Sequence, residues 1–477
     1  MKTPFSKYLQ ETAPDLKELV SLLDEKYEYV SLLATDSAGI VLQSSRQTKA
    51  IVGDTMMTER GIVIRVMKDG LYSEYAFNDL EPGKVNEKAK EIIDSLEKDL
   101  ALLKETKTEV YETKKLSDES LTLFVEMETE ELPENADLEV LMEEITKCGE
   151  EVRLGSENIV NCNVTAQSTH VSKMFLTKNR DLRQSYVYSE ASILSMAANE
   201  EKSVVDYTGV SGRKGPELFK ELKDCVPEAV SNIKAMLKAK RIVPGEYEII
   251  TSPVVTGLIA HEAFGHGVEI DMFVKERALG KEYIGKRVGS DIVSMHEGAN
   301  AVLDVASFAF DDEGTLAGDV TEIDHGILKT GICDALSAAR LGIEPTGNGK
   351  RENFEHKAYT RMTNTMFDSG EDSLEDMIAS VKNGYLLEGM QSGMEDPKHW
   401  GIQCIIAYGK EIKDGKLTGE TVSPIVLTGY VPELLGNISM ASTDRLSFGN
   451  GGCGKGYKEW VKVSDGGPYL KTKARLG

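Results

Sequence analysis

The sequence predicts an α+β protein in which helical and strand-forming segments alternate along the chain. Three observations lead to this fold class. A chain of 477 residues is too long for one hydrophobic core and is typical of about three domains. Within the first hundred residues, two stretches with the helical period enclose a stretch with period-two alternation. After residue 243 the chain is rich in glycine and β-branched residues, which favours strands and loops.

The first of these segments is expected to fold as a helix, an antiparallel sheet and a second helix. Residues 14–26, PDLKELVSLLDEK, open with proline and place their apolar side chains on one helical face. Residues 27–77 have the pattern of a β-meander whose strands are separated by Asp-Ser-Ala-Gly and Lys-Asp-Gly turns. Residues 84–104 return to the helical period. This arrangement defines an N-terminal α+β domain, residues 1–106.

A polar stretch at about residues 105–120 predicts the boundary to a middle α+β domain, residues 107–240. Its sequence indicates a helix at about 137–153 and strands between 158 and 197.

A long helix is expected from Pro216 to Lys240, and Pro227 should kink or break it, because proline removes a hydrogen-bond donor and clashes with the preceding turn. The remainder, residues 241–477, is expected to form a β-rich C-terminal domain.

The charge and composition exclude several classes of partner. With 79 acidic and 55 basic residues the formal charge is −24, which repels nucleic acids and anionic lipid surfaces. No apolar run reaches the ~20 residues of a membrane-spanning helix, and the first residues lack the apolar core of a secretory signal. The six cysteines are scattered without a C-x-x-C pair, which favours free thiols. We therefore expect a cytoplasmic protein with no nucleic-acid or membrane partner.

The stretch LIAHEAFGHGVE, residues 258–269, has the residue types of a metallopeptidase helix with an unusual spacing. In H-E-x-x-H the two histidines reach one ion from the same helical face, and the glutamate activates water. Here the spacing is i, i+5, which on a regular helix places His261 and His266 roughly 140° apart. A turn widened by one residue, or a helix that ends at Gly265, would bring His266 back toward His261. The alternative is a pair of structural histidines beside a surface glutamate, Glu262.

A metal ion needs at least one further ligand, and three residues are candidates. Glu269 and Asp271 follow the histidines closely, although residues so near are often second-sphere partners. Cys453 lies between glycines in SFGNGGCGKGYKEW, and a neighbouring Lys455 would lower the pKa of its thiol toward the metal-binding thiolate form.

The same glycines also fit half of a phosphate-binding loop, G-x-x-x-x-G-K. Gly456 stands where that loop needs serine or threonine, and no amphipathic helix follows. We therefore expect no nucleotide site.

Five separated motifs resemble the TldD branch of the TldD/PmbA family, in the family's order. They are HEAFGHGVE, FDDEGT (310–315), PTGNGKRE (345–352), RMTNT (361–365) and GGCGKG (451–456). The resemblance implies a zinc-dependent peptidase with an HExxxH helix. It implies that His261, His266 and Cys453 hold Zn²⁺, that Glu262 is the catalytic glutamate and that no other cofactor is required.

The resemblance also implies a β-rich C-terminal metallopeptidase domain and a dimer that encloses the active site. Small or unfolded peptides are the implied substrates, and the dimer would form with a second copy or with a PmbA/TldE-like paralogue. A different hypothesis is a non-catalytic binding or regulatory subunit, PmbA-like, whose metal is structural or absent. A closed four-ligand site would favour that subunit, whereas three ligands and an open position favour the peptidase.

Overall fold

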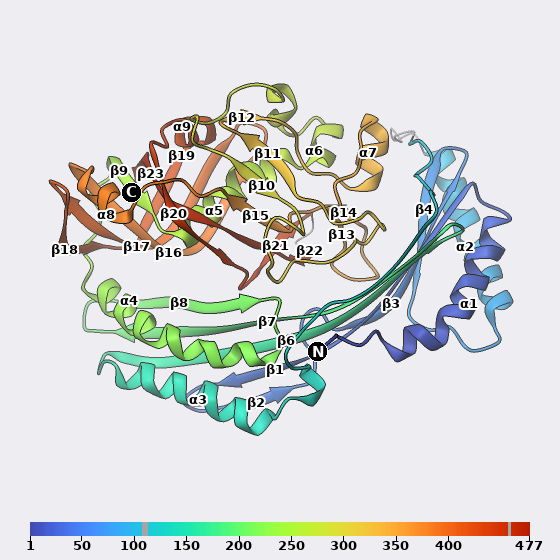
Figure 1. The fold of residues 1–477 in the computed structure, drawn as a ribbon, viewed down its shortest axis with the longest axis horizontal. Coiled ribbons are helices and arrows are strands. Elements are labelled where there is room, and N and C mark those ends of the chain that lie inside the picture. Colours follow the sequence, from blue (N-terminus) through green and yellow to red (C-terminus); the bar gives the residue numbers. More distant parts are fainter. Residues whose placement is uncertain (107–112, 457–458) are drawn as a thin grey trace.

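The computed structural model describes residues 1–106, 113–456 and 459–477, and within these ranges it confirms the predicted α+β class (Figure 1). The described strands form two large sheets, of eight and eleven strands, and two short two-stranded ribbons. None of the described helices is both long and apolar enough to cross a membrane.

The N-terminal sheet has the strand order β4-β3-β1-β6-β7-β5, with β2 added to β1 and β8 added to β7. Its strands are β1 (Tyr29–Ser44), β2 (Lys49–Val52), β3 (Glu59–Lys68), β4 (Leu71–Phe77), β5 (Leu121–Glu126), β6 (Ile159–Thr177), β7 (Arg180–Ala198) and β8 (Ser203–Gly212). Because β1 pairs with β6, both N-terminal segments contribute to one sheet. The division into residues 1–106, 107–240 and 241–477 stays a prediction, and residues 107–112 of its first boundary lie outside the described residues.

Helices cover one face of the N-terminal sheet, and the C-terminal half of the chain covers the other. The helical elements are α1 (Lys7–Asp24), α2 (Val85–Glu105), the short 3₁₀ turn Pro133–Asn135, α3 (Leu138–Leu154), the 3₁₀ helix Pro216–Cys225 and α4 (Val226–Lys238). Leu32 of β1 packs with α1 and α2, and Leu42 on the same face packs with α3 and α4 (Figure 1). Leu33, on the opposite face, packs with Phe310.

Two local predictions in this half are wrong, and each has a physical reason. The first helix begins at Lys7, not at residue 14, because Ser6 caps it: the Leu9 N–H donates to Ser6 Oγ at 3.2 Å, and Pro14 lies inside the helix. The predicted Asp-Ser-Ala-Gly turn lies within β1. Its backbone pairs with β3 and β6, and a Cβ on Gly39 would lie 2.5 Å from the Ser168 carbonyl oxygen.

Two other local predictions are confirmed. The Lys-Asp-Gly turn joins β3 to β4, with positive φ angles at Asp69 (53°) and Gly70 (76°). The long helix predicted from Pro216 is broken where expected, because Pro227 lies in the first turn of α4, the position that a proline tolerates best.

The C-terminal sheet contains a closed ring of strands. Its strands are β9 (Gly245–Thr251), β10 (Met295–Glu297), β11 (Val320–Asp324), β12 (Ile327–Leu328), β15 (Asn364–Phe367), β16 (Asn383–Asp396), β17 (Gly401–Lys413), β18 (Lys416–Val422), β19 (Ile425–Tyr430), β20 (Met440–Phe448) and β23 (Ser464–Leu476). The order β23-β19-β17-β16-β9 returns to β23, which pairs with β9. The two ribbons are β13 (Gly349–Lys350) with β14 (Tyr359–Thr360), and β21 (Gly452–Lys455) with β22 (Glu459–Lys462).

The short helices of this half connect the strands, and one of them lies in the core. They are α5 (Pro253–Ala260), the irregular turns His261–Gly265 and His266–Val268, α6 (Ile270–Val274), the 3₁₀ helix Leu279–Tyr283, α7 (Ala335–Leu341), α8 (Leu374–Ala379) and α9 (Val431–Gly436). Nearly every residue of α5 is buried, and the helix packs against β16 and β23. The core therefore fixes the position and direction of α5, and with them the position of the residues that follow it.

Asp206 on β8 predicts a pH dependence of stability. It is 3% exposed, one of its oxygens has no hydrogen-bond partner, and burial raises its pKa to about 7. The folded protein then keeps this proton up to about pH 7, whereas the unfolded chain loses it near pH 4, so stability falls as the pH rises between these values. Relative to wild type, Asp206→Asn should gain up to ~4 kcal/mol in free energy of unfolding between pH 4 and pH 8. Urea unfolding at both pH values measures this gain; an equal gain in Asp79→Asn, an exposed aspartate, would contradict the assignment.

Candidate metal centre

An irregular turn solves the spacing problem of the two histidines. After α5 the chain forms one π-helical turn, His261–Gly265, in which the His266 N–H donates to the His261 carbonyl. The widened turn brings the two imidazoles to 5.1 Å between ring centroids, at 89° to each other. Gly265 makes room for this turn, because a Cβ there would lie 2.1 Å from the Met362 sulfur.

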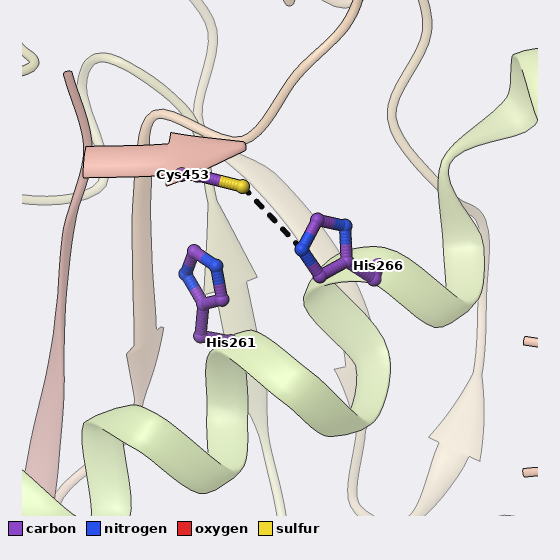
Figure 2. Close-up of side chains that lie close together, drawn as sticks. All are labelled: His261, His266 and Cys453. Atoms are coloured by element: carbon purple, nitrogen blue, oxygen red, sulfur yellow. Dashed lines mark hydrogen bonds between the residues drawn. The ribbon is translucent and has the colours of Figure 1, made fainter. Parts of the chain in front are cut away.

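Cys453 reaches the histidines from the far end of the sequence. It lies on β21, opposite Val461 of β22, and its Sγ is 3.4 Å from His266 Nε2. Figure 2 shows the thiol directed at the His266 ring, with His261 beside both. The three ligand atoms lie within 4.8 Å of one another. The structure thus brings together His261, His266 and Cys453, the three residues that the family resemblance implied.

The donor set and its protonation suit a zinc ion. Two imidazole nitrogens and one thiolate are ordinary zinc ligands, and three of them leave a tetrahedral position open. Burial alone would raise the pKa of the Cys453 thiol, but the adjacent imidazoles of His266 and His261 hold it well below its ordinary value. This shift favours the thiolate, the form that binds metals. Lys455 does not cause this shift, contrary to the expectation from sequence.

Lys455 belongs instead to a buried ion network behind His266. His266 Nδ1 lies 3.1 Å from Glu269 Oε2, and Lys455 Nζ lies 3.1 Å from the same oxygen and 2.7 Å from Asp271 Oδ1. The carboxylate fixes the ring so that Nε2 faces Cys453, as second-sphere carboxylates do in metal sites. Glu269 and Asp271, the alternative third ligands, are thus committed to other partners.

His261 has a weaker second-sphere partner that sequence reasoning missed. Its Nδ1 is buried, makes no hydrogen bond with any residue that the structure describes, and lies 3.6 Å from Asp465 Oδ2. Burial raises the pKa of Asp465 to about 7. Asp465 stands at the start of β23, just over 200 residues further along the chain than His261, and no local motif marks it.

Glu262 lines the same cleft as these three side chains, and the group whose ligand atoms converge does not include it. It is 8% exposed, and burial raises the pKa of its carboxyl, an effect that the two histidines partly offset. Gly393 of β16 makes room for it, because a Cβ there would lie 2.5 Å from Glu262 Cγ. Sequence reasoning did not identify Gly393, which is one of 43 glycines and carries no motif.

One cleft of about 850 Å³ is lined by His261, Glu262, His266 and Cys453. One wall is formed by residues 390–395 of β16, and the other by residues 448–456, which lead into β21. A volume of this size is typical of sites for small molecules or short peptides.

The N-terminal sheet holds the loop that carries Cys453. Asn450 Nδ2 donates to the carbonyl oxygens of Ala191 (3.0 Å) and Val210 (3.1 Å), on β7 and β8. On either side of it, the Gly449 N–H donates to Ser211 Oγ, and the Gly451 N–H donates to a carboxylate oxygen of Glu190. We call residues 449–451 the anchor segment.

Comparisons with known proteins agree with this geometry. Residues 244–474 match the family described as PmbA/TldA metallopeptidase C-terminal domain. The chain is 32% identical to Metalloprotease MJ0996 of Methanocaldococcus jannaschii over 269 residues, 55% of this chain and 58% of that protein. It is 30% identical to the Zinc metalloprotease TldD homolog of Saccharolobus solfataricus over 244 residues, 50% and 52% of the two chains. The chain thus spans little more than half the length of these relatives.

The crystal structure of TldE from Thermococcus kodakarensis matches the whole fold. Its TM-score is 0.78, with coverage of 97% of this chain and 100% of that chain. The sequence identity is 18%, so this likeness concerns the fold alone.

Asn450 offers a test of the anchor segment. In Asn450→Ala the hydrogen bonds to the Ala191 and Val210 carbonyls are lost, so we expect the affinity for Zn²⁺ to fall roughly 10- to 100-fold. Competition with a chromogenic chelator measures this affinity. The control is Asn300→Ala, which loses an amide-to-carbonyl hydrogen bond elsewhere. Equal zinc affinity in wild type and Asn450→Ala would show that the anchor segment does not position Cys453.

Proposed function

We propose that this chain is a zinc-dependent peptidase of the TldD/PmbA family. The observation that carries the proposal is the convergence of two imidazoles and one thiolate beside a buried glutamate in a cleft. A structural zinc site normally closes its shell with a fourth protein ligand, and among the described residues none joins this group of three.

In this proposal His261, His266 and Cys453 hold the ion. When bound, zinc supplies a Lewis acid that polarises a carbonyl group and makes water more acidic. Glu269 and Asp465 orient the two imidazoles from behind, and the cleft admits the substrate from the open side.

Glu262 is the proton carrier in this proposal. Because its pKa is raised above the ordinary glutamate value, its carboxylate accepts a proton from water more readily near neutral pH. It then returns that proton to the amine that leaves when the peptide bond breaks. Gly393 keeps the carboxyl at the edge of the cleft, where both transfers take place.

The cleft favours extended peptides as substrates. In the described structure, β16 pairs with β9 only through residues 384–387, so the corresponding edge of residues 390–395 has no strand partner there. An unfolded peptide offers backbone groups that can pair with such an edge, whereas a folded protein does not fit the cleft. We therefore propose small or unfolded peptides as the substrate class.

We also propose that the active protein is a dimer, with a second copy or with a TldE-like paralogue. The match of the whole chain to the fold of TldE supports a paralogue of similar shape as partner. Light scattering of the purified chain, alone and mixed with such a paralogue, distinguishes the two assemblies.

Replacing Glu262 by glutamine tests the role of the carboxylate. Glu262→Gln should keep its zinc, because Glu262 is not a ligand, while peptide turnover falls by ~10²–10⁴. Metal analysis and a fluorogenic peptide assay measure both quantities. Exposed Glu433→Gln is the control. If zinc and activity were lost together, Glu262 would be a ligand instead.

Replacing Cys453 by alanine tests the ligand set. Cys453→Ala should lose or weaken zinc binding and abolish turnover, whereas Cys162→Ala, another buried free cysteine, should keep both. In wild type, bound zinc should slow alkylation of Cys453, and chelation should accelerate it. Cys162 provides the reference, because burial raises the pKa of its thiol to about 11. Full zinc occupancy in Cys453→Ala would favour the non-catalytic reading or a different third ligand.

A further inference from the structure

An exposed tryptophan lies beside the metal centre. Trp460 of β22 is 43% exposed and stands opposite Gly454, the residue that follows Cys453. Its ring covers the glycine backbone of β21: a Cβ on Gly452 would lie 3.5 Å from the indole, and one on Gly454 would lie 3.7 Å from it. The indole thus lies over the strand that presents the thiolate, at a distance that an added Cβ would meet as an ordinary van der Waals contact.

The opposite wall of the cleft also exposes an apolar side chain. Met394 of β16 is 61% exposed and lines the same cleft as Trp460. It is the neighbour of Gly393, whose missing side chain accommodates Glu262. Both apolar residues therefore line the cleft that also contains the ligand cluster.

Large apolar side chains in a concave site favour an apolar ligand group, since water is displaced when the group binds. The occupant that fits this position is a peptide, because Trp460 and Met394 line the cleft that also contains His261, Glu262 and Cys453. A peptide held beside the metal centre would place one of its own side chains between the two walls.

We propose that Trp460 and Met394 form an apolar subsite that selects peptides with a large aliphatic or aromatic side chain next to the cleaved bond. This inference rests on the proposed peptidase function and adds its substrate class. Tryptophan presents a broad rigid surface and methionine an adaptable one, so the subsite accepts several apolar side chains rather than one.

Binding can be measured without cleavage in the full-length Glu262→Gln protein loaded with zinc. The probes are fluorescently labelled hexapeptides of serine and glycine, with a single leucine moved through each position. Fluorescence anisotropy should show one position at which leucine binds roughly 10- to 100-fold more tightly than serine. Adding Trp460→Ala should remove most of this preference and leave the serine peptide unchanged. Trp460→Phe should keep most of it.

Leu446→Ala is the matched control, because Leu446 is 65% exposed and does not line the cleft. Three results for Trp460→Ala would each overturn the subsite. They are an equal loss of affinity for leucine and serine peptides, a loss of zinc, and conversion of a dimer to a monomer. If leucine peptides bind selectively but wild type cleaves none of them, the peptidase proposal fails while the apolar subsite stands. If wild type cleaves peptides but binding shows no preference for leucine, the apolar subsite fails while the peptidase proposal stands.

Discussion

The attachment of the Cys453 loop to the N-terminal sheet is the interaction on which the metal centre depends. Both histidines are fixed by the core, since they follow a helix buried in the C-terminal ring. Cys453 lies on a two-stranded ribbon, which is marginally stable by itself. The ribbon is held by packing of Cys453 against Ile332 and Met362, and by Arg361, which donates to the Cys453 carbonyl. Asn450 ties the start of that ribbon to two strands of the N-terminal sheet. The N-terminal sheet thus helps to position Cys453, although all three candidate ligands belong to the C-terminal half of the chain.

A buried network of charged side chains, next to His266, also supports the candidate site. Lys455, two residues after Cys453, lies between Glu269 and Asp271 and balances two buried carboxylates. Removing one member of such a network leaves a buried charge without a partner, which is strongly destabilising. The ribbon that supplies the thiolate therefore also supplies the cation that allows Glu269 to stay ionised beside His266.

Sequence reasoning succeeded where local pattern decides the structure. Periodicity placed α2, α3 and the two long strands β6 and β7, and the glycines of the HExxxH segment indicated an irregular turn. It failed at the start of α1 and at Asp-Ser-Ala-Gly, where a cap and two flanking strands override the local signal.

The site residues divide in the same way. His261, Glu262 and His266 share one motif, whereas spacing alone left the third ligand open among three residues. The contributions of Asp465, Gly393 and Asn450 depend on contacts between segments far apart in the chain, so a single sequence gives no sign of them.

The long interval between the ligands has a consequence for synthesis of the protein. Cys453 follows His266 by 187 residues, which a ribosome translates in roughly 10 to 40 s at ~5–20 residues per second. During that interval a growing chain carries both histidines and the complete set of N-terminal strands, but not the thiolate. In the proposed peptidase, this order leaves the centre unfinished while both histidines are already present, so attack on the protein itself or on neighbouring nascent chains cannot begin before Cys453 has been added.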